Sequence, residues 1–176
     1  SGGKLMTIES LKVLKQGLIQ AMQAEREGQY FYLMAAGSTE DPKGKDVFRR
    51  LAAEELDHFN YLKRQYDSIV ETGAANAGLS LGAPPSLDGK SPIFSDSIKS
   101  RIGEAHFEMT ALSLAMQLEL DAEKFYKEQA GKVDDQTAKS FYLKLAEWEV
   151  GHYRALLAQS EMLKEDYWSQ GGFAPF

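Results

Sequence analysis

The chain contains no cysteine, and its 176 residues include only three histidines, His58, His106 and His152. The lack of cysteine excludes disulfides, thiol catalysis and every metal site built on thiolates. Any metal must therefore be held by His, Asp or Glu. Positive charge is also scarce, with 20 Lys and Arg against 26 Asp and Glu and a net charge of -6. This balance argues against a nucleic-acid backbone or an anionic membrane surface as the main partner.

Long apolar runs are missing as well. No run approaches the ~18 residues of a membrane-spanning helix, and no apolar signal core follows the N-terminus. The sequence therefore predicts a cytoplasmic protein with no membrane partner. With 43% hydrophobic residues, residues 1–176 are expected to form one domain with a sizeable core.

Proline is confined to five positions, 42, 84, 85, 92 and 175. The proline-free windows are rich in good helix formers, and their apolar side chains recur in alternating steps of three and four. The pattern predicts an all-α chain with helices over about 7–37, 42–72, 98–130 and 134–165. Residues suited to capping stand at the expected ends: Thr7, Asp41, and Asp134 or Asp135 as N-caps, and Gly37 and Gly73 as stops.

The connections predict the topology. The loops within the first and second helix pairs are short, so each pair should be an antiparallel hairpin. Residues 73–97 are dense in Gly, Ser, Ala and Pro and could be a flexible linker or a crossover. A lone hairpin has nothing to bury its apolar face against, which favours the crossover and an antiparallel four-helix bundle of ferritin-like arrangement. The aromatic tail, 166–176, is too short for a fifth helix and is expected to cover the bundle end or a neighbouring subunit.

The two halves repeat each other at an offset of 94 residues. Ala-Met-Gln-x-Glu at 21–25 recurs at 115–119, and Leu-Ala-x-x-Glu-x-x-His at 51–58 recurs at 145–152. Across windows 21–32 and 51–62, 11 of 24 positions are identical to their counterparts, far more than chance gives. The hairpins are therefore expected to be pseudo-symmetric.

The repeated acidic residues lie on the apolar faces. Glu25 and Glu119 replace aliphatic residues there, and each Glu-x-x-His places its two side chains on one face. A single Glu-x-x-His is usually only solvated surface, and a lone glutamate in a seam is more often an ion-paired core residue. Both features occur twice at matched spacing, and four buried carboxylates without cations would be costly. The sequence therefore predicts two divalent metal ions held by six residues: Glu25, Glu55, His58, Glu119, Glu149 and His152.

With these motifs, the chain resembles the rubrerythrin-type members of the ferritin-like superfamily over essentially residues 7–165. The resemblance implies one iron on Glu25 and His58 and another on Glu119 and His152. Glu55 and Glu149 would bridge the two irons. Hard carboxylates with imidazole suit Fe(II) or Mn(II), with zinc as a further option. Tyr32 and Tyr126 could hydrogen-bond the site or relay an electron, or could simply be buried aromatics above and below it.

The resemblance also implies a non-haem di-iron oxidoreductase that reduces peroxide or O2. Two departures bear on this function. Rubrerythrins with a rubredoxin domain need cysteine, so this chain would need an external electron donor such as a rubredoxin. An extra glutamate of the family falls here on Ala122, whose repeat partner is Gly28, which leaves the peroxidase mechanism open. The alternatives are iron storage with ferroxidase activity, hydroxylation of a small organic substrate, and metal binding without turnover. A homodimer or larger homo-oligomer is expected.

Overall fold

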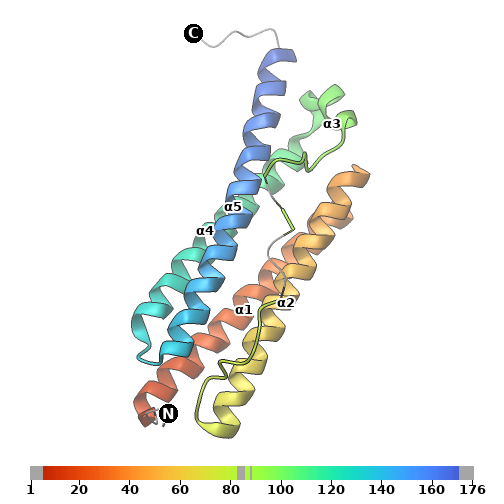
Figure 1. The fold of residues 1–176 in the computed structure, drawn as a ribbon. Helices are drawn as coiled ribbons and strands as arrows, with labels where there is room; N and C mark the ends of the chain where they lie inside the picture. Colours follow the sequence, from red (N-terminus) through yellow and green to blue (C-terminus); the bar gives the residue numbers. More distant parts are fainter. Residues whose placement is uncertain (1–5, 83–85, 88, 171–176) are drawn as a thin grey trace.

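The structure is a computed structural model, which describes residues 6–82, 86–87 and 89–170 (Figure 1). It is all-helical over these residues, with no strand among them. Five α-helices and one short 3₁₀ helix follow one another along the chain: α1 (Ile8–Ser38), α2 (Pro42–Thr72), α3 (Asp96–Ser100), η1 (Ile102–Glu104), α4 (His106–Lys132) and α5 (Gln136–Gln170).

The helix ends follow the capping chemistry of the sequence at most positions. The Thr7 hydroxyl accepts from the Ser10 amide, and the Asp41 carboxylate accepts from the Gly44 amide at 2.8 Å, as expected for N-caps. Asp135 Oδ1 accepts from the Ala138 amide. Gly73 ends α2 with φ of 74°, a left-handed conformation that suits glycine.

Gly37 does not end α1, contrary to expectation. The helix continues through Ser38, and Thr39 ends it in an extended conformation while its amide still bonds Ala35 O. Gly37 can remain helical because the stop comes from Thr39 and from the start of α2 at Pro42.

The third helix begins later than predicted. Residues 96–104 form α3 and η1 instead of the first turns of a long helix, and α4 starts at His106. Ile98, Ile102 and Ala105 are all buried, so they keep helical spacing across a break at Arg101, where φ is -116° and ψ is 25°. The spacing of the apolar residues therefore reflects their burial and cannot show where the helix is interrupted.

The fourth long helix ends later than predicted. Residues 166–170, expected to belong to the tail, continue α5. Tyr167 and Trp168 lie on this last turn and are exposed at 39% and 54%, so they do not cover the end of the molecule within this chain. The rest of the tail, 171–176, lies outside the described residues.

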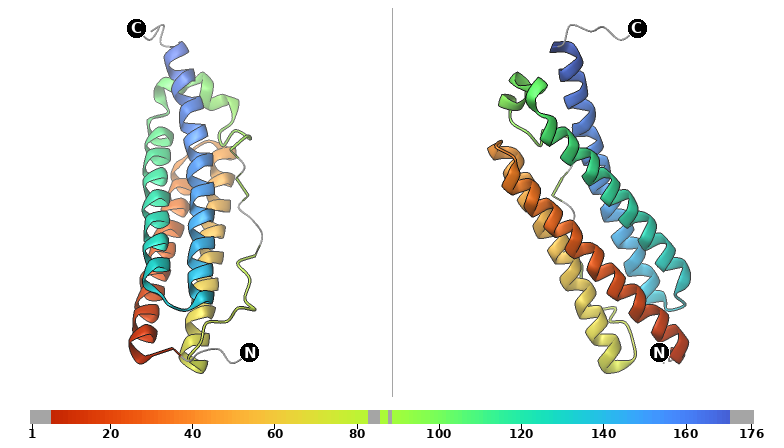
Figure 2. Two further views of the ribbon diagram at one scale, coloured as in Figure 1. Left: turned by 60° about the vertical axis from the view of Figure 1, so that its left-hand side comes forward. Right: turned by 180° about the vertical axis from the view of Figure 1, so that it is seen from behind.

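The four long helices form two hairpins, α1 with α2 and α4 with α5 (Figure 2). Two buried apolar clusters each take residues from all four long helices. One cluster, around Phe48 and Leu112, lies toward the α1–α2 loop, and the other, around Leu62 and Leu145, lies toward the α4–α5 loop. The apolar faces of the hairpins are therefore buried against each other, as the sequence predicted.

The described residues of the segment between the hairpins lie beside α2 and α5 and form hydrogen bonds with both (Figure 2). Its Asn76 amide donates to Gln65 of α2, and its Ile93 amide donates to Gln159 of α5. The described residues of this segment are therefore held against one hairpin at one end and the other hairpin at the other, as a crossover requires.

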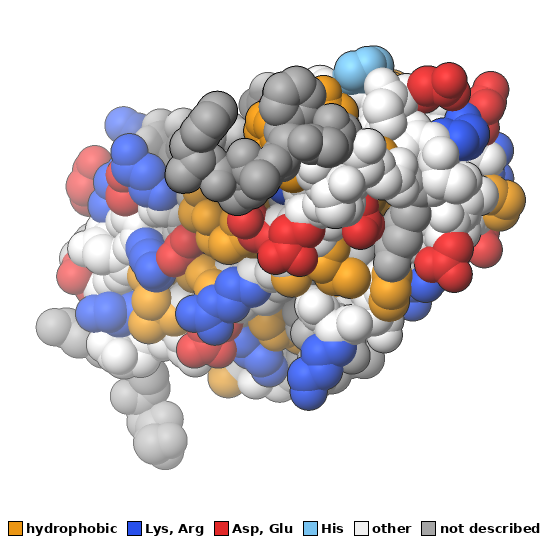
Figure 3. Space-filling model, turned by 90° about the horizontal axis from the view of Figure 1, so that it is seen from above, with side chains coloured by type: hydrophobic (Ala, Val, Ile, Leu, Met, Phe, Trp, Pro, Cys, Tyr) orange, Lys and Arg blue, Asp and Glu red, His pale blue; other side chains and the backbone are white. Residues whose placement is uncertain are grey.

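Acidic and basic side chains are interspersed on the face of the molecule that Figure 3 presents. Within the part of the chain that the structure describes, no helix combines the length and apolarity needed to cross a membrane.

Candidate metal centre

A layer of acidic and imidazole side chains lies between the two apolar clusters. It draws residues from all four long helices, and each of them is at most 5% exposed. One Glu comes from α1, one from α4, and a Glu-x-x-His pair comes from each of α2 and α5. The structure thus brings together all six residues that the sequence predicted as ligands: Glu25, Glu55, His58, Glu119, Glu149 and His152.

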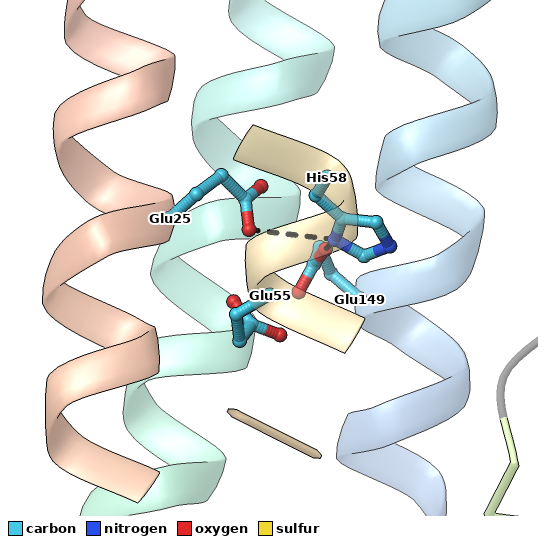
Figure 4. A group of neighbouring side chains, drawn as sticks. All are labelled: Glu25, Glu55, His58 and Glu149. Carbon is cyan, nitrogen blue, oxygen red and sulfur yellow. Dashed lines mark ion pairs between the residues drawn. The ribbon is translucent and has the colours of Figure 1, made fainter. Parts of the chain in front are cut away.

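The six residues form two overlapping groups. In each group four ligand atoms, one per residue, lie within 4.8 Å of one another. Glu55 and Glu149 belong to both groups, so two ions held there would share these two carboxylates. The first group is completed by Glu25 and His58 (Figure 4), and the second by Glu119 and His152.

Both imidazoles turn Nδ1 toward the carboxylates. His58 Nδ1 lies 3.1 Å from Glu149 Oε1 and 3.4 Å from Glu25 Oε2 (Figure 4). His152 Nδ1 lies 3.5 Å from both Glu55 Oε1 and Glu119 Oε1. Nδ1 is therefore the nitrogen of each ring that could bind a metal.

Several inward atoms of this layer make no hydrogen bond to the described residues. They include Nδ1 of both histidines, both oxygens of Glu149, Glu25 Oε2 and Glu55 Oε1. Buried polar atoms without partners are costly, and buried charges are normally paired or bound to metals. The unpartnered atoms are all possible metal-ligand atoms and converge on one region, so the donor set fits metal ions.

The acids and imidazoles of this layer are crowded together and buried, and both conditions shift several of their pKa values. Burial raises the pKa of Glu55 well above its ordinary value, and Glu149 and Glu25 add to the shift. Burial and Glu149 likewise raise the pKa of Glu119 to about 8. Burial alone would raise the pKa of Glu149, but hydrogen bonding with Glu119, followed by that with His152 and His58, holds it well below its ordinary value.

The imidazoles hold protons for the same reason. Burial alone would lower the pKa of His58, but Glu25 and Glu149 raise it to about 10. The pKa of His152 is also raised well above its ordinary value, with Glu119 the main cause opposing burial. Without metal, the layer therefore offsets part of its negative charge with bound protons, and a metal ion would have to displace them.

Tyr32 and Tyr126 form crossed hydrogen bonds between the hairpins. Tyr32 of α1 donates to Glu119 Oε1 of α4, and Tyr126 of α4 donates to Glu25 Oε1 of α1. Burial and the nearby carboxylates raise the pKa of both phenols well above the ordinary value. Both hydroxyls therefore keep their protons and act as donors, and they contact the site as the sequence suggested they could.

Glu54 is a member of the site that the sequence reading missed. Its Oε2 lies 2.6 Å from His152 Nε2, on the side of the ring opposite Nδ1. Glu54 looked like an ordinary surface acid because it points about 100° around α2 from Glu55. A comparison of the two repeats singles it out, because its counterpart at 148 is Trp.

The positions flanking the ligands differ between the hairpins. A Cβ atom on Gly28 would lie 2.8 Å from Glu55 Oε2, so this glycine gives the carboxylate its room. Ala122 is half-buried and packs against the apolar cluster around Leu62. The next residue, Glu123, pairs with Lys127 of the same helix. His106 is exposed at the first turn of α4 and is absent from both groups.

No protein-family model, curated protein or solved structure matches this chain.

Proposed function

We propose that this chain is a ferritin-like four-helix bundle of rubrerythrin type that binds two metal ions and reduces peroxide or O2. The observation that carries the proposal is the sharing of Glu55 and Glu149 by two four-residue groups. One Glu from each of two helices with Glu-x-x-His from each of the other two is the ligand set of di-iron and di-manganese carboxylate proteins. The ring and carboxylate donors favour Fe(II) or Mn(II), and zinc would fit the same atoms.

When bound, a pair of such ions would supply the redox chemistry. The protein's own contribution is to hold the ligands in place and keep bulk water out. Each terminal carboxylate is fixed by a tyrosine hydroxyl at one oxygen, Glu25 by Tyr126 and Glu119 by Tyr32. The remaining oxygens are free to face a metal. The apolar clusters above and below the layer limit access of solvent.

The reaction needs an external electron source. Reduction of hydrogen peroxide to two waters consumes two electrons and two protons. The chain has no cysteine and hence no thiolate-ligated iron centre of its own. A separate donor protein, such as a rubredoxin, would therefore deliver the electrons.

The first test is metal loading under anaerobic conditions, followed by desalting and metal analysis. Wild-type protein should retain two ions per chain. Replacing Glu55→Gln and Glu149→Gln together should abolish paired binding because both shared ligands lose their charge. Glu147→Gln, at an exposed glutamate of α5, is the matched control and should leave binding intact. Retention of two ions by the double variant would refute the assignment.

The second test separates the candidate activities. Iron-loaded protein is mixed with peroxide or O2 in the presence of a reductant. Repeated oxidation and reduction supports the oxidoreductase. A single oxidation with many irons retained per chain supports storage, and O2 consumption only with an organic compound supports a hydroxylase. Bound metal with no spectral change would leave a metal-binding protein without turnover and refute all three activities.

A further inference from the structure

We propose that Glu54 is a positioning residue for His152 alone and that the two metal positions are therefore unequal, with the His152 position filled first. The inference rests on the proposed metal pair. It starts from a contact that the repeat does not duplicate, the 2.6 Å approach of Glu54 Oε2 to His152 Nε2.

The contact determines which ring nitrogen is available to a metal. A carboxylate next to Nε2 keeps the proton on that nitrogen, which leaves the Nδ1 lone pair directed at Glu55 and Glu119. A carboxylate that accepts from the outer nitrogen of a ligand histidine fixes the tautomer and the ring orientation, and it makes the ring a stronger ligand. Glu54 is well placed for this role because its side chain is only 17% exposed.

Glu54 is itself held in place by the crossover. Its second oxygen, Oε1, accepts from the Ser86 amide at 2.8 Å. Both carboxylate oxygens therefore have a defined partner, one on α5 and one on the crossover. These two contacts hold the carboxylate in place beside the His152 ring.

The equivalent position in the other half carries no carboxylate. The repeat places Trp148 where Glu54 stands, and its ring lies 5.1 Å from the His58 ring between centroids, tilted by 55°. His58 Nε2 is buried and finds no hydrogen-bond partner among the residues that the structure describes. On the Nε2 side, only packing holds the His58 ring, whereas a hydrogen bond holds the His152 ring.

The two half-sites otherwise match closely. Each has one terminal Glu, one tyrosine donor from the opposite hairpin, one His and the two shared carboxylates. The difference at 54 and 148 is the one that acts on a ligand histidine, and it favours the half-site of Glu119 and His152. Loss of such an outer hydrogen bond typically costs 10–100-fold in metal affinity, which sets the size of the expected inequality.

The test is an anaerobic titration of the full chain with Co²⁺, followed by visible absorption. Wild-type protein should bind two ions in two steps whose affinities differ by about 10-fold or more. Glu54→Ala should weaken the first step by about 10–100-fold so that the steps merge. Glu54→Gln keeps an oxygen acceptor and should fall between the two.

Two further variants separate positioning from a purely structural role. Ser86→Pro removes the amide that Glu54 Oε1 accepts from but leaves the contact to His152, so the first step should stay close to wild type. Trp148→Phe keeps an aromatic ring beside His58 and should also leave the first step unchanged. Unfolding of each metal-free variant is measured alongside, to show that any loss of affinity is not a loss of fold.

The proton on His152 Nε2 gives a second readout. Bound Co²⁺ shifts the NMR signals of its ligands away from the other protons, including the exchangeable ring N–H. The signal of His152 should exchange slowly in wild-type protein, because Glu54 holds the proton, and should exchange rapidly in Glu54→Ala. The signal of His58 should not respond to this substitution. If Glu54 had only a structural role, Glu54→Ala would not change the exchange rate of the His152 signal while leaving that of the His58 signal unchanged.

Failure of this inference differs from failure of the proposed function. If wild-type protein binds two Co²⁺ ions with equal affinity, or if Glu54→Ala leaves both steps and the N–H signals unchanged, the role of Glu54 is refuted while the metal pair stands. If wild-type protein binds one ion, and that ion depends on Glu54 and His152, the metal pair is refuted while the role of Glu54 stands.

Discussion

Gln65 and Gln159 occupy equivalent positions in the two hairpins, and each binds the backbone of the crossover. Gln65 Oε1 accepts from the Asn76 amide, and its Nε2 donates to Asn76 O, both at 2.9 Å. Gln159 Oε1 accepts from the Ile93 amide at 2.7 Å, and its Nε2 donates to Ser91 O. The repeat therefore extends beyond the layer of buried acids and imidazoles to the two ends of the segment that joins the hairpins.

These two glutamines should contribute substantially to stability. Both are buried, and replacing either with Ala removes two hydrogen bonds to the backbone of the crossover. We expect Gln65→Ala and Gln159→Ala each to lower the free energy of unfolding by about 2 kcal/mol, since each of the two lost hydrogen bonds contributes about 0.5–1.5 kcal/mol. Urea denaturation measures the change. Gln23→Ala, at an exposed glutamine of α1, is the control, and an equal loss there would contradict the interpretation.

The crossed tyrosine contacts should act on one half-site each. Tyr126→Phe frees Glu25 Oε1, and Tyr32→Phe frees Glu119 Oε1. Each change should weaken binding at its own position by about 10–100-fold, the usual effect of removing a partner of a metal ligand. Metal titration of each variant measures the effect.

Tyr142→Phe is the matched control for these tyrosines. Tyr142 is fully buried, but its hydroxyl has no hydrogen-bond partner within the described part of the chain, and its repeat counterpart is Phe48. The substitution should leave metal binding unchanged and keep or raise stability. Equal losses of affinity in all three variants would mean that the tyrosines act through packing.

The sequence was sufficient for the helices and for the six clustered residues because both are periodic. Glutamates on an apolar stripe, repeated at a fixed offset, leave few possible arrangements once two hairpins must bury their faces against each other. The capping residues Thr7 and Asp41 likewise act within three residues of themselves. The predictions of the helices and of the clustered residues thus depend on local chemistry and on the internal repeat.

The remaining features depend on contacts that no local pattern encodes. Glu54 meets His152 across 98 residues of sequence, and the contact exists only because the hairpins pack as they do. The late start of α4 was hidden because Ile98 and Ile102 are buried in the same cluster on either side of the break. Burial imposes the same spacing on a broken helix as on a continuous one.

Gly28 provides the room that Glu55 needs, so Gly28→Ala should separate metal binding from stability. The new Cβ would lie 2.8 Å from Glu55 Oε2, the end of a flexible side chain that can move. Helix propensity favours Ala over Gly by up to about 1 kcal/mol, so the metal-free protein should be as stable as wild type or more so. Paired metal binding should weaken because a shared carboxylate is displaced.

Gly37→Ala is the control for this substitution. A Cβ at Gly37 would meet nothing within 4 Å, so this variant should gain stability and bind metal as wild type does. Thermal unfolding and metal titration of both variants are the measurements. Unchanged metal binding in Gly28→Ala would show that Glu55 tolerates displacement and would contradict a tight geometric role for its carboxylate.

The metal-free protein should lose stability as the pH rises. The pKa of His58 is raised from 6.5 to about 10. Its contribution to the free energy of unfolding is therefore complete below pH 6.5 and is lost as the pH rises through 10. The raised pKa of Glu119, about 8, acts in the same direction between about pH 4.5 and 8. Thermal unfolding from pH 5 to 10 should show this decline. His58→Gln should flatten it above pH 7, whereas His106→Gln, at the exposed histidine, should not. A wild-type slope in His58→Gln would mean that other groups control the pH dependence.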